Sequence, residues 1–115
     1  MPTAQEPENT SETTAPAAQV IFWYRDLPPL AAEPLEEHTV QASSARVSGA
    51  LSYGDEAWKR CYADALAQAT VHLEQQVARR GGRYAHVLSE AVNVRHSGAT
   101  GEAWLDLALK YMLYR

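Results

Sequence analysis

The sequence predicts an α+β fold in which a single helix packs on one face of a small β-sheet, in the order β-α-β-β. One long segment has apolar residues at three- and four-residue spacing, which is typical of an amphipathic helix. Two later segments alternate apolar residues at every second position, with a glycine-containing turn between them, as expected for a β-hairpin. With 115 residues, the chain has room for one such domain.

The composition divides the chain into three parts. All six prolines precede residue 35, and all six glycines follow residue 48. Residues 1–19 have almost no large apolar side chains, so we expect them to form a disordered acidic tail. We expect residues 20–34 to form an apolar, proline-rich arm and residues 35–115 to form the β-α-β-β domain.

The charge and cysteine content exclude several classes of protein. The first 34 residues hold five acids and one base, a balance of −4 that equals the net charge of the whole chain. The neutral remainder has no basic patch, so neither nucleic acid nor a membrane surface is an expected partner. Cys61 is the only cysteine, which excludes an internal disulfide. No stretch resembles a signal peptide or a membrane span, and we expect a cytoplasmic protein.

The arm contains the most concentrated apolar stretch of the chain. It consists of Val20, Ile21, Phe22, Trp23 and Tyr24. Because such a stretch would aggregate if left in solvent, we expect it to pair with a sheet edge, in the same subunit or a neighbouring one. The alternative is that residues 20–30 act as a docking arm for another protein, since extended and proline-rich segments are common recognition elements.

Two segments before the hairpin also have clear patterns. Residues 38–53 alternate like a strand, with a change of phase at Ser43-Ser44 that a β-bulge would cause. Residues 55–82 predict the helix, with Asp55 as N-cap and Gly81-Gly82 as the C-terminal stop. The predicted buried stripe of the helix comprises Trp58, Cys61, Tyr62, Ala65, Ala69, Leu73 and Val77.

The hairpin predicts a second apolar sheet face. With a five-residue turn, His96 lies opposite Glu102, and Ala85, Val87, Ser89 and Ala91 face Leu113, Tyr111, Leu109 and Leu107 under the helix. The other face then holds Tyr84, His86, Leu88, Val92, Trp104, Met112 and Tyr114, together with Val94. A single helix covers only one face of a sheet, so we expect this second face to be buried against other subunits.

No residue pattern predicts catalysis or a bound metal or cofactor. Cys61 and His72 stand roughly 16 Å apart along a helix, and His86 and His96 roughly 33 Å apart along a strand. His38, beside two glutamates, lacks the spaced ligands of a closed metal site. We therefore expect a non-enzymatic, self-associating structural or interaction module that forms a homo-oligomer. The alternative is a small-ligand or metal-binding protein whose pocket lies between subunits.

The layout resembles the YbjQ-like family of small bacterial domains, which carries a heavy-metal-binding label. The likeness lies in an Ala- and Glu-rich helix that runs into a glycine turn, then Gly82-x-x-Ala85 entering a strand, and a final hairpin, over roughly residues 39–115. This resemblance implies a β-α-β-β fold and a ring-like homo-oligomer. The metal label is not transferred, because no matched position is a metal ligand. The "KYMLYR" end also departs from that family's glycine- and serine-rich last strand.

Overall fold

A computed structural model describes residues 20–115 and confirms the predicted fold class, with one helix on one face of a mixed sheet. In chain order the elements are β2 (Val20–Trp23), β3 (Pro34–Ser43), β4 (Val47–Ser48), α1 (Glu56–Arg79), β5 (Tyr84–His96) and β6 (Glu102–Tyr114). The predicted acidic tail, residues 1–19, lies outside the described residues.

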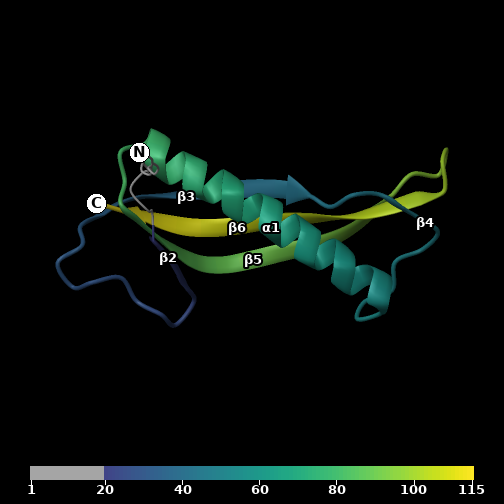
Figure 1. The fold of residues 1–115 in the computed structure, drawn as a ribbon, viewed down its shortest axis with the longest axis horizontal. Coiled ribbons are helices and arrows are strands. Elements are labelled where there is room, and N and C mark those ends of the chain that lie inside the picture. Colours follow the sequence, from purple (N-terminus) through teal and green to yellow (C-terminus); the bar gives the residue numbers. More distant parts are fainter. Residues whose placement is uncertain (1–19) are drawn as a thin grey trace, which may run out of the picture.

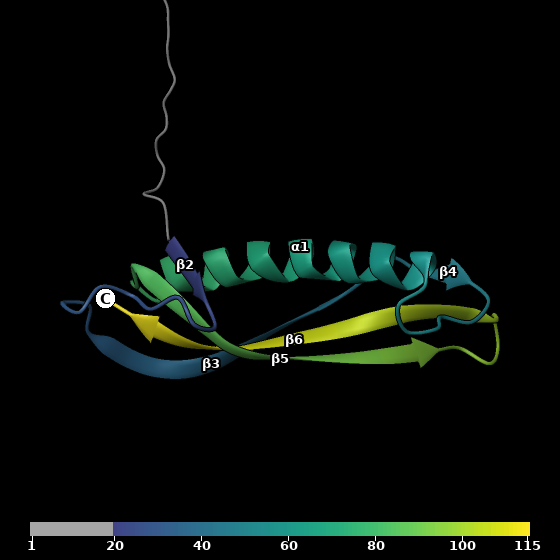
Figure 2. The same cartoon turned by 90° about the horizontal axis from the view of Figure 1, so that it is seen from below.

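The sheet has the strand order β2-β5-β6-β3, and β4 pairs with β6 beyond the end of β3. β2 runs parallel to β5, whereas the other pairs are antiparallel. Figure 2 shows α1 on one side of the sheet and, among residues 20–115, no element of comparable size on the other. We call the side without α1 the open face.

Local signals place the ends of α1 as predicted. The Asp55 carboxylate accepts a hydrogen bond from the Trp58 amide, which satisfies a donor of the first turn. After the last turn, Gly81 adopts a positive φ of 74°, and the Gly82 amide donates back to the Val77 carbonyl. The fully buried stripe of the helix comprises Cys61, Ala65, Ala69, Leu73 and Val77.

The core lies between α1 and the two strands β6 and β3. Alternate residues of β6 face the helix and are buried: Ala103, Leu105, Leu107, Leu109, Tyr111 and Leu113. From β3, Val40 and Ala42 join them. Ala65 and Ala69 of α1 are fully buried, and small side chains at these positions let the helix lie close to the strands. Figure 1 shows that α1 crosses the strands diagonally.

The arm pairs with the sheet of its own chain. Val20–Trp23 runs beside Tyr84–Val87, the first residues of β5, which confirms the expected pairing with a sheet edge. Ile21 and Trp23 pack against the main hydrophobic core. The chain then leaves the sheet at Tyr24, whose φ of 56° is unusual for a residue other than glycine.

The predicted change of phase after Ser43 is confirmed. Ser43 pairs with Asp106 and Val47 with Ala103, so four steps along one strand oppose three along β6. Ser44 bridges the break. Its amide donates to the Leu105 carbonyl, and its hydroxyl accepts from the Leu105 amide at 3.0 Å.

The predicted hairpin register is correct where β5 begins and β6 ends, and it is wrong beyond Val87 as far as the hairpin turn. Ala85 faces Leu113 and Val87 faces Tyr111, as expected. A bulge at Leu88 then shifts the pairing by one residue, because two residues of β5 oppose one of β6. The predicted partners Leu109, Leu107 and Glu102 of Ser89, Ala91 and His96 are therefore replaced by Lys110, Ala108 and Ala103.

The bulge exchanges the faces of the second half of β5. Glu90, Val92 and Val94 pair with residues that face α1, so they lie on the helix side. Placing Val92 and Val94 on the second face was therefore wrong. The open face instead receives Ser89, Ala91, Asn93 and Arg95, all of which are exposed. Leu88 lies in the bulge with 40% of its surface exposed.

Candidate functional site

The open face carries apolar and aromatic side chains at both ends and polar ones in the middle. At the end near β2, the rings of Phe22 and Tyr84 lie 5.9 Å apart. Met112 and Tyr114 of β6, both half-buried, are on the same side of the sheet. At the opposite end, the Arg46 guanidinium lies 4.0 Å from the centre of the Trp104 ring.

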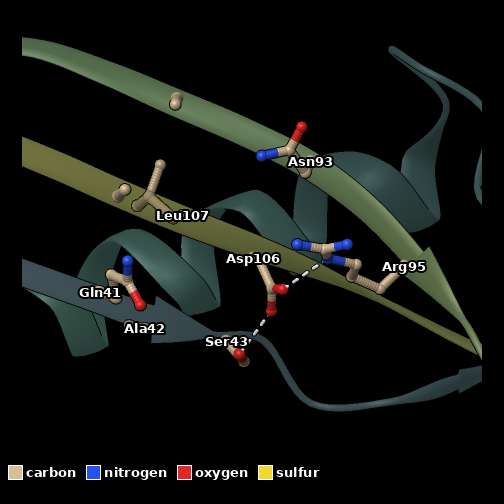
Figure 3. Close-up of a pocket in the computed structure, with 9 residues that line it drawn as sticks. Gln41, Ala42, Ser43, Asn93, Arg95, Asp106 and Leu107 are labelled. Carbon is tan, nitrogen blue, oxygen red and sulfur yellow. Dashed lines mark hydrogen bonds and ion pairs between the residues drawn. The ribbon is translucent and has the colours of Figure 1, made fainter.

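A shallow hollow of about 180 Å³ occupies the middle of the open face. Figure 3 shows its polar side chains, which come from β3, β5 and β6. The lining comprises Gln41, Ala42, Ser43, Ala91, Asn93, Arg95, Asp106, Leu107 and Ala108. The bulge creates this hollow, because it turns Asn93 and Arg95 toward the open face.

Asp106 organises the charges of the hollow. Its carboxylate accepts from the Ser43 hydroxyl at 2.6 Å and from Arg95 Nε at 2.8 Å. The Ser43 hydrogen bond and the Arg95 charge hold the pKa of Asp106 below its usual range. Among the residues drawn in Figure 3, no hydrogen bond is marked to the side-chain amides of Gln41 and Asn93, each of which carries both donors and an acceptor.

His86 is buried by its own chain rather than left open on this face. Its Nε2–H donates to the Tyr24 carbonyl at 2.6 Å, and 8% of the residue is exposed. The acceptor is a carbonyl, so the proton must sit on Nε2. The hydrogen bond ties the end of β2 to β5 and gives His86 a structural partner within the chain.

An aromatic groove of about 500 Å³ lies on the helix side, between the first half of α1 and β5. Its lining comprises Tyr53, Trp58, Tyr62, Glu90, Val92 and Val94. The rings of Trp58 and Tyr62 are stacked 5.4 Å apart, and Tyr53 meets Trp58 edge-on at 4.8 Å. Sequence reasoning missed this groove because the wrong register placed its β5 residues on the other face.

Glu90 links β5 to α1 at the base of the groove. The Tyr62 hydroxyl donates to both carboxylate oxygens of Glu90, at 2.8 and 3.0 Å. Burial, this hydrogen bond and the Glu90 charge raise the pKa of Tyr62 to about 12. Burial and the same carboxylate raise the pKa of Tyr24.

We expect Glu90→Gln to lower the pKa of Tyr62 toward its ordinary value of 10.0, because the negative charge that opposes tyrosinate formation is removed. Tyrosinate absorbance followed by pH titration measures the change, and Tyr62→Phe identifies the contributing ring. Because folding raises the pKa of Tyr62, its protonated hydroxyl contributes to the free energy of unfolding. This contribution is fully present below pH 10.0 and is lost as the pH rises to about 12. Glu74→Gln, on the exposed side of α1, is the control and should leave the titration unchanged.

The residues considered as metal ligands or nucleophiles have other contacts. Among residues 20–115, no cluster of three His, Cys, Asp or Glu side chains could hold a metal ion. His38 Nε2 lies 3.4 Å from the Glu36 carboxylate, without forming a well-aligned hydrogen bond. Cys61 is buried with its Sγ 3.9 Å from the Ala45 carbonyl, whereas His72 Nδ1–H donates to the main-chain carbonyl of Gln41 on β3 at 3.1 Å.

Comparisons with known proteins found no match to any protein family, curated protein or solved structure. The likeness to the YbjQ-like family therefore stays a prediction. In the part of the chain from residue 20 onward, α1 is not apolar enough to cross a membrane.

Proposed function

We propose that the protein is a non-enzymatic, self-associating module that forms a homo-oligomer through its open face. The observation that carries this proposal is the sheet face opposite α1, which no element of residues 20–115 covers and which holds the half-buried side chains of Trp104, Met112 and Tyr114. Burying such side chains against a second copy removes apolar surface from water. Tyr84 and Leu88 remain part of the proposed interface. The predicted interface residues His86 and Val92 are not included, because His86 is already buried within its own chain and Val92 lies on the helix side.

The polar middle of the open face suits the centre of such an interface. The Asp106 carboxylate is neutralised by Arg95 and hydrogen-bonded by Ser43, so little uncompensated charge would be buried. The amides of Gln41 and Asn93 could then bond across the interface and fix its orientation. An α+β module of this kind acts as a structural component of a larger assembly.

A second proposed contact is with another protein, through residues 20–30 of the arm. Beyond β2 the chain exposes Leu27 and Leu30, with relative exposures of 70% and 104%, beside Pro28 and Pro29. Exposed apolar residues next to prolines suit an extended docking segment. We also propose a cytoplasmic location and no nucleic-acid or membrane partner. The near-neutral charge of residues 35–115 supports the second point, because it offers no basic surface to phosphate groups or anionic lipids.

The hollow favours a second candidate function, the binding of a small polar ligand between subunits. It offers amide donors and acceptors from Gln41 and Asn93 beside the Asp106–Arg95 ion pair. A second copy seated on the open face would close it. A ligand that co-purifies with the native assembly and is lost from Asn93→Ala would favour this function.

Met112→Glu tests the proposed interface. By light scattering, we expect the wild type to have the mass of an oligomer and the variant to have the mass of a monomer. Burying an unpaired charge in a dry interface makes the free energy of association less favourable by about 3–5 kcal/mol. Val71→Glu is the matched control, since Val71 is 49% exposed on α1, away from the open face. A wild type that stays monomeric at every concentration would contradict the proposal.

A further inference from the structure

β5 has a free outer edge over most of its length. β2 pairs with it only as far as Val87, and within the described residues nothing pairs with Leu88–His96 on that side. The Ser97 amide donates to the Glu102 carbonyl, which identifies a hydrogen-bonded pair of the hairpin. Because such pairs alternate, the main-chain groups of Glu90, Val92, Val94 and His96 point away from β6.

The other edge of the sheet, formed by β3, is blocked against further strand pairing, whereas no described residue blocks the edge of β5 in this way. β3 begins with Pro34, and the His72 side chain donates to the outward carbonyl of Gln41. Prolines and bound side chains are common means of blocking an edge strand. From Ser89 to His96, β5 has no proline and no further bulge, and no hydrogen bond in the described residues reaches its outward main chain. This edge is therefore open to an additional strand.

The aromatic groove lies over the same edge. Figure 1 shows the first half of α1 passing across β5 and out beyond its unpaired side. The groove is lined by Tyr53, Trp58 and Tyr62 on the helix side. Val94, at its floor, remains 48% exposed. A strand laid along the edge would place every second side chain against these rings.

The charge of the groove indicates what such a strand would carry. Glu90 is the charged residue of the lining, and it lies in line with Val92 and Val94 on the helix side of β5. Opposite charges in facing positions of two strands stabilise the pairing, whereas like charges weaken it. The complementary strand therefore has apolar side chains opposite the two valines and a basic side chain opposite Glu90.

We propose that the outer edge of β5 binds an extended peptide of another protein as an added antiparallel strand, with two alternate apolar side chains in the aromatic groove and a following Lys or Arg against Glu90. Antiparallel pairing is the more stable arrangement per residue. Added strands of this kind gain affinity from the main chain and specificity from the side-chain pockets.

β2 already occupies the neighbouring part of this edge. It pairs with Tyr84–Val87, and its Ile21 and Trp23 pack on the core side of the sheet. The positive φ of Tyr24 then turns the main chain away, so no described strand continues along this edge beyond Val87, and the Tyr24 side chain lies beside Glu90. The proposed peptide would occupy the same edge beyond that turn and would run in the direction opposite to β2.

The probe is a short synthetic peptide in which isoleucine, tryptophan and arginine, in this order, alternate with threonine. A second peptide has glutamate in place of arginine. Binding to the full chain is measured by titration calorimetry, and amide hydrogen exchange locates the bound strand. We expect protection of the Val92, Val94 and His96 amides, and binding of the glutamate peptide about ten-fold weaker.

Two proline variants separate edge pairing from other contacts. Val94→Pro removes an outward amide that β6 does not use, and edge strands tolerate proline, so the fold should survive while binding is lost. Thr39→Pro is the matched control, because Thr39 occupies the equivalent outward position on β3 and the variant should bind the probe like the wild type. Glu90→Lys provides a test without proline and should prefer the glutamate peptide.

Several outcomes would overturn the proposal. One is a wild type that does not bind the arginine peptide below millimolar concentration, and another is undiminished binding by both Val94→Pro and Glu90→Lys. If Val94→Pro instead converts a wild-type oligomer to a monomer, the edge is occupied by a second copy. These readouts are independent of Met112→Glu, so failure of this site and failure of the proposed self-association are distinguishable.

Discussion

Replacing Tyr111 by alanine is expected to lower the free energy of unfolding by about 3–5 kcal/mol, as large aromatic truncations in a core do. Tyr111 is fully buried on β6 beneath α1 and is among the largest side chains of the core. Its ring lies 5.8 Å from that of His38, and its hydroxyl donates to Gln76 of α1 at 2.8 Å. Denaturant unfolding followed by circular dichroism measures the loss.

Tyr111→Phe separates the contribution of the hydroxyl from that of the ring. The phenylalanine ring fills the same space, so we expect a loss of only about 1 kcal/mol, from the missing hydrogen bond to Gln76. Equal losses for the two variants would show that the ring is not part of the packed core. Such a result would contradict the placement of α1 on β6.

Any side chain at position 82 is expected to separate the end of α1 from β6. A Cβ atom there would overlap the Leu113 side chain, with Leu113 Cγ at 3.0 Å and the Tyr114 carbonyl at 3.2 Å. Leu113 is buried and has little room to move. We expect Gly82→Val to lower the free energy of unfolding by about 1–3 kcal/mol or more, as overpacking in a core does.

Gly98→Val is the control for Gly82→Val. An added Cβ at Gly98, in the hairpin turn, meets nothing within 4 Å. The two variants make the same chemical change, so the difference between their thermal midpoints isolates the steric effect at Gly82. A midpoint for Gly82→Val equal to that of the Gly98 variant would contradict the observed packing of the helix end against β6.

The sequence was a good guide where the determining signals are local. Asp55 and Gly81 lie next to the helix ends that they define, and the apolar stripe between them repeats with the period of the helix. The change of phase after Ser43 was equally readable, because apolar residues switch from even to odd positions there. In both cases the pattern and the structure depend on neighbouring residues.

The register of the hairpin shows where this reasoning fails. Apolar residues of β5 also switch parity, from Ala85 and Val87 to Val92 and Val94, as expected for a bulge. The prediction instead carried one register through the whole strand, because the turn alone was used to set the pairing. The bulge at Leu88 allows the apolar residues of both halves of β5 to face α1. The pairing with β6 determines which side of the sheet each residue faces.

The candidate sites depended on information that the sequence does not contain locally. The aromatic groove requires residues of α1 to meet Glu90 on the helix side of β5, and the diagonal path of the helix brings them together. The hollow of the open face likewise requires Asn93 and Arg95 on the side opposite α1. Both sites follow from the register, so one pairing error concealed both.

The bulge also determines where the chain can change length. Leu88 is the extra residue between Val87 and Ser89, which pair with consecutive residues of β6. A chain lacking Leu88 would keep every other pair of the hairpin and both faces of β5. An insertion or deletion between Ser89 and His96 would instead exchange interior and exterior side chains along part of the strand. We therefore expect the pairing of β5 with β6 to tolerate a change in strand length at this one position.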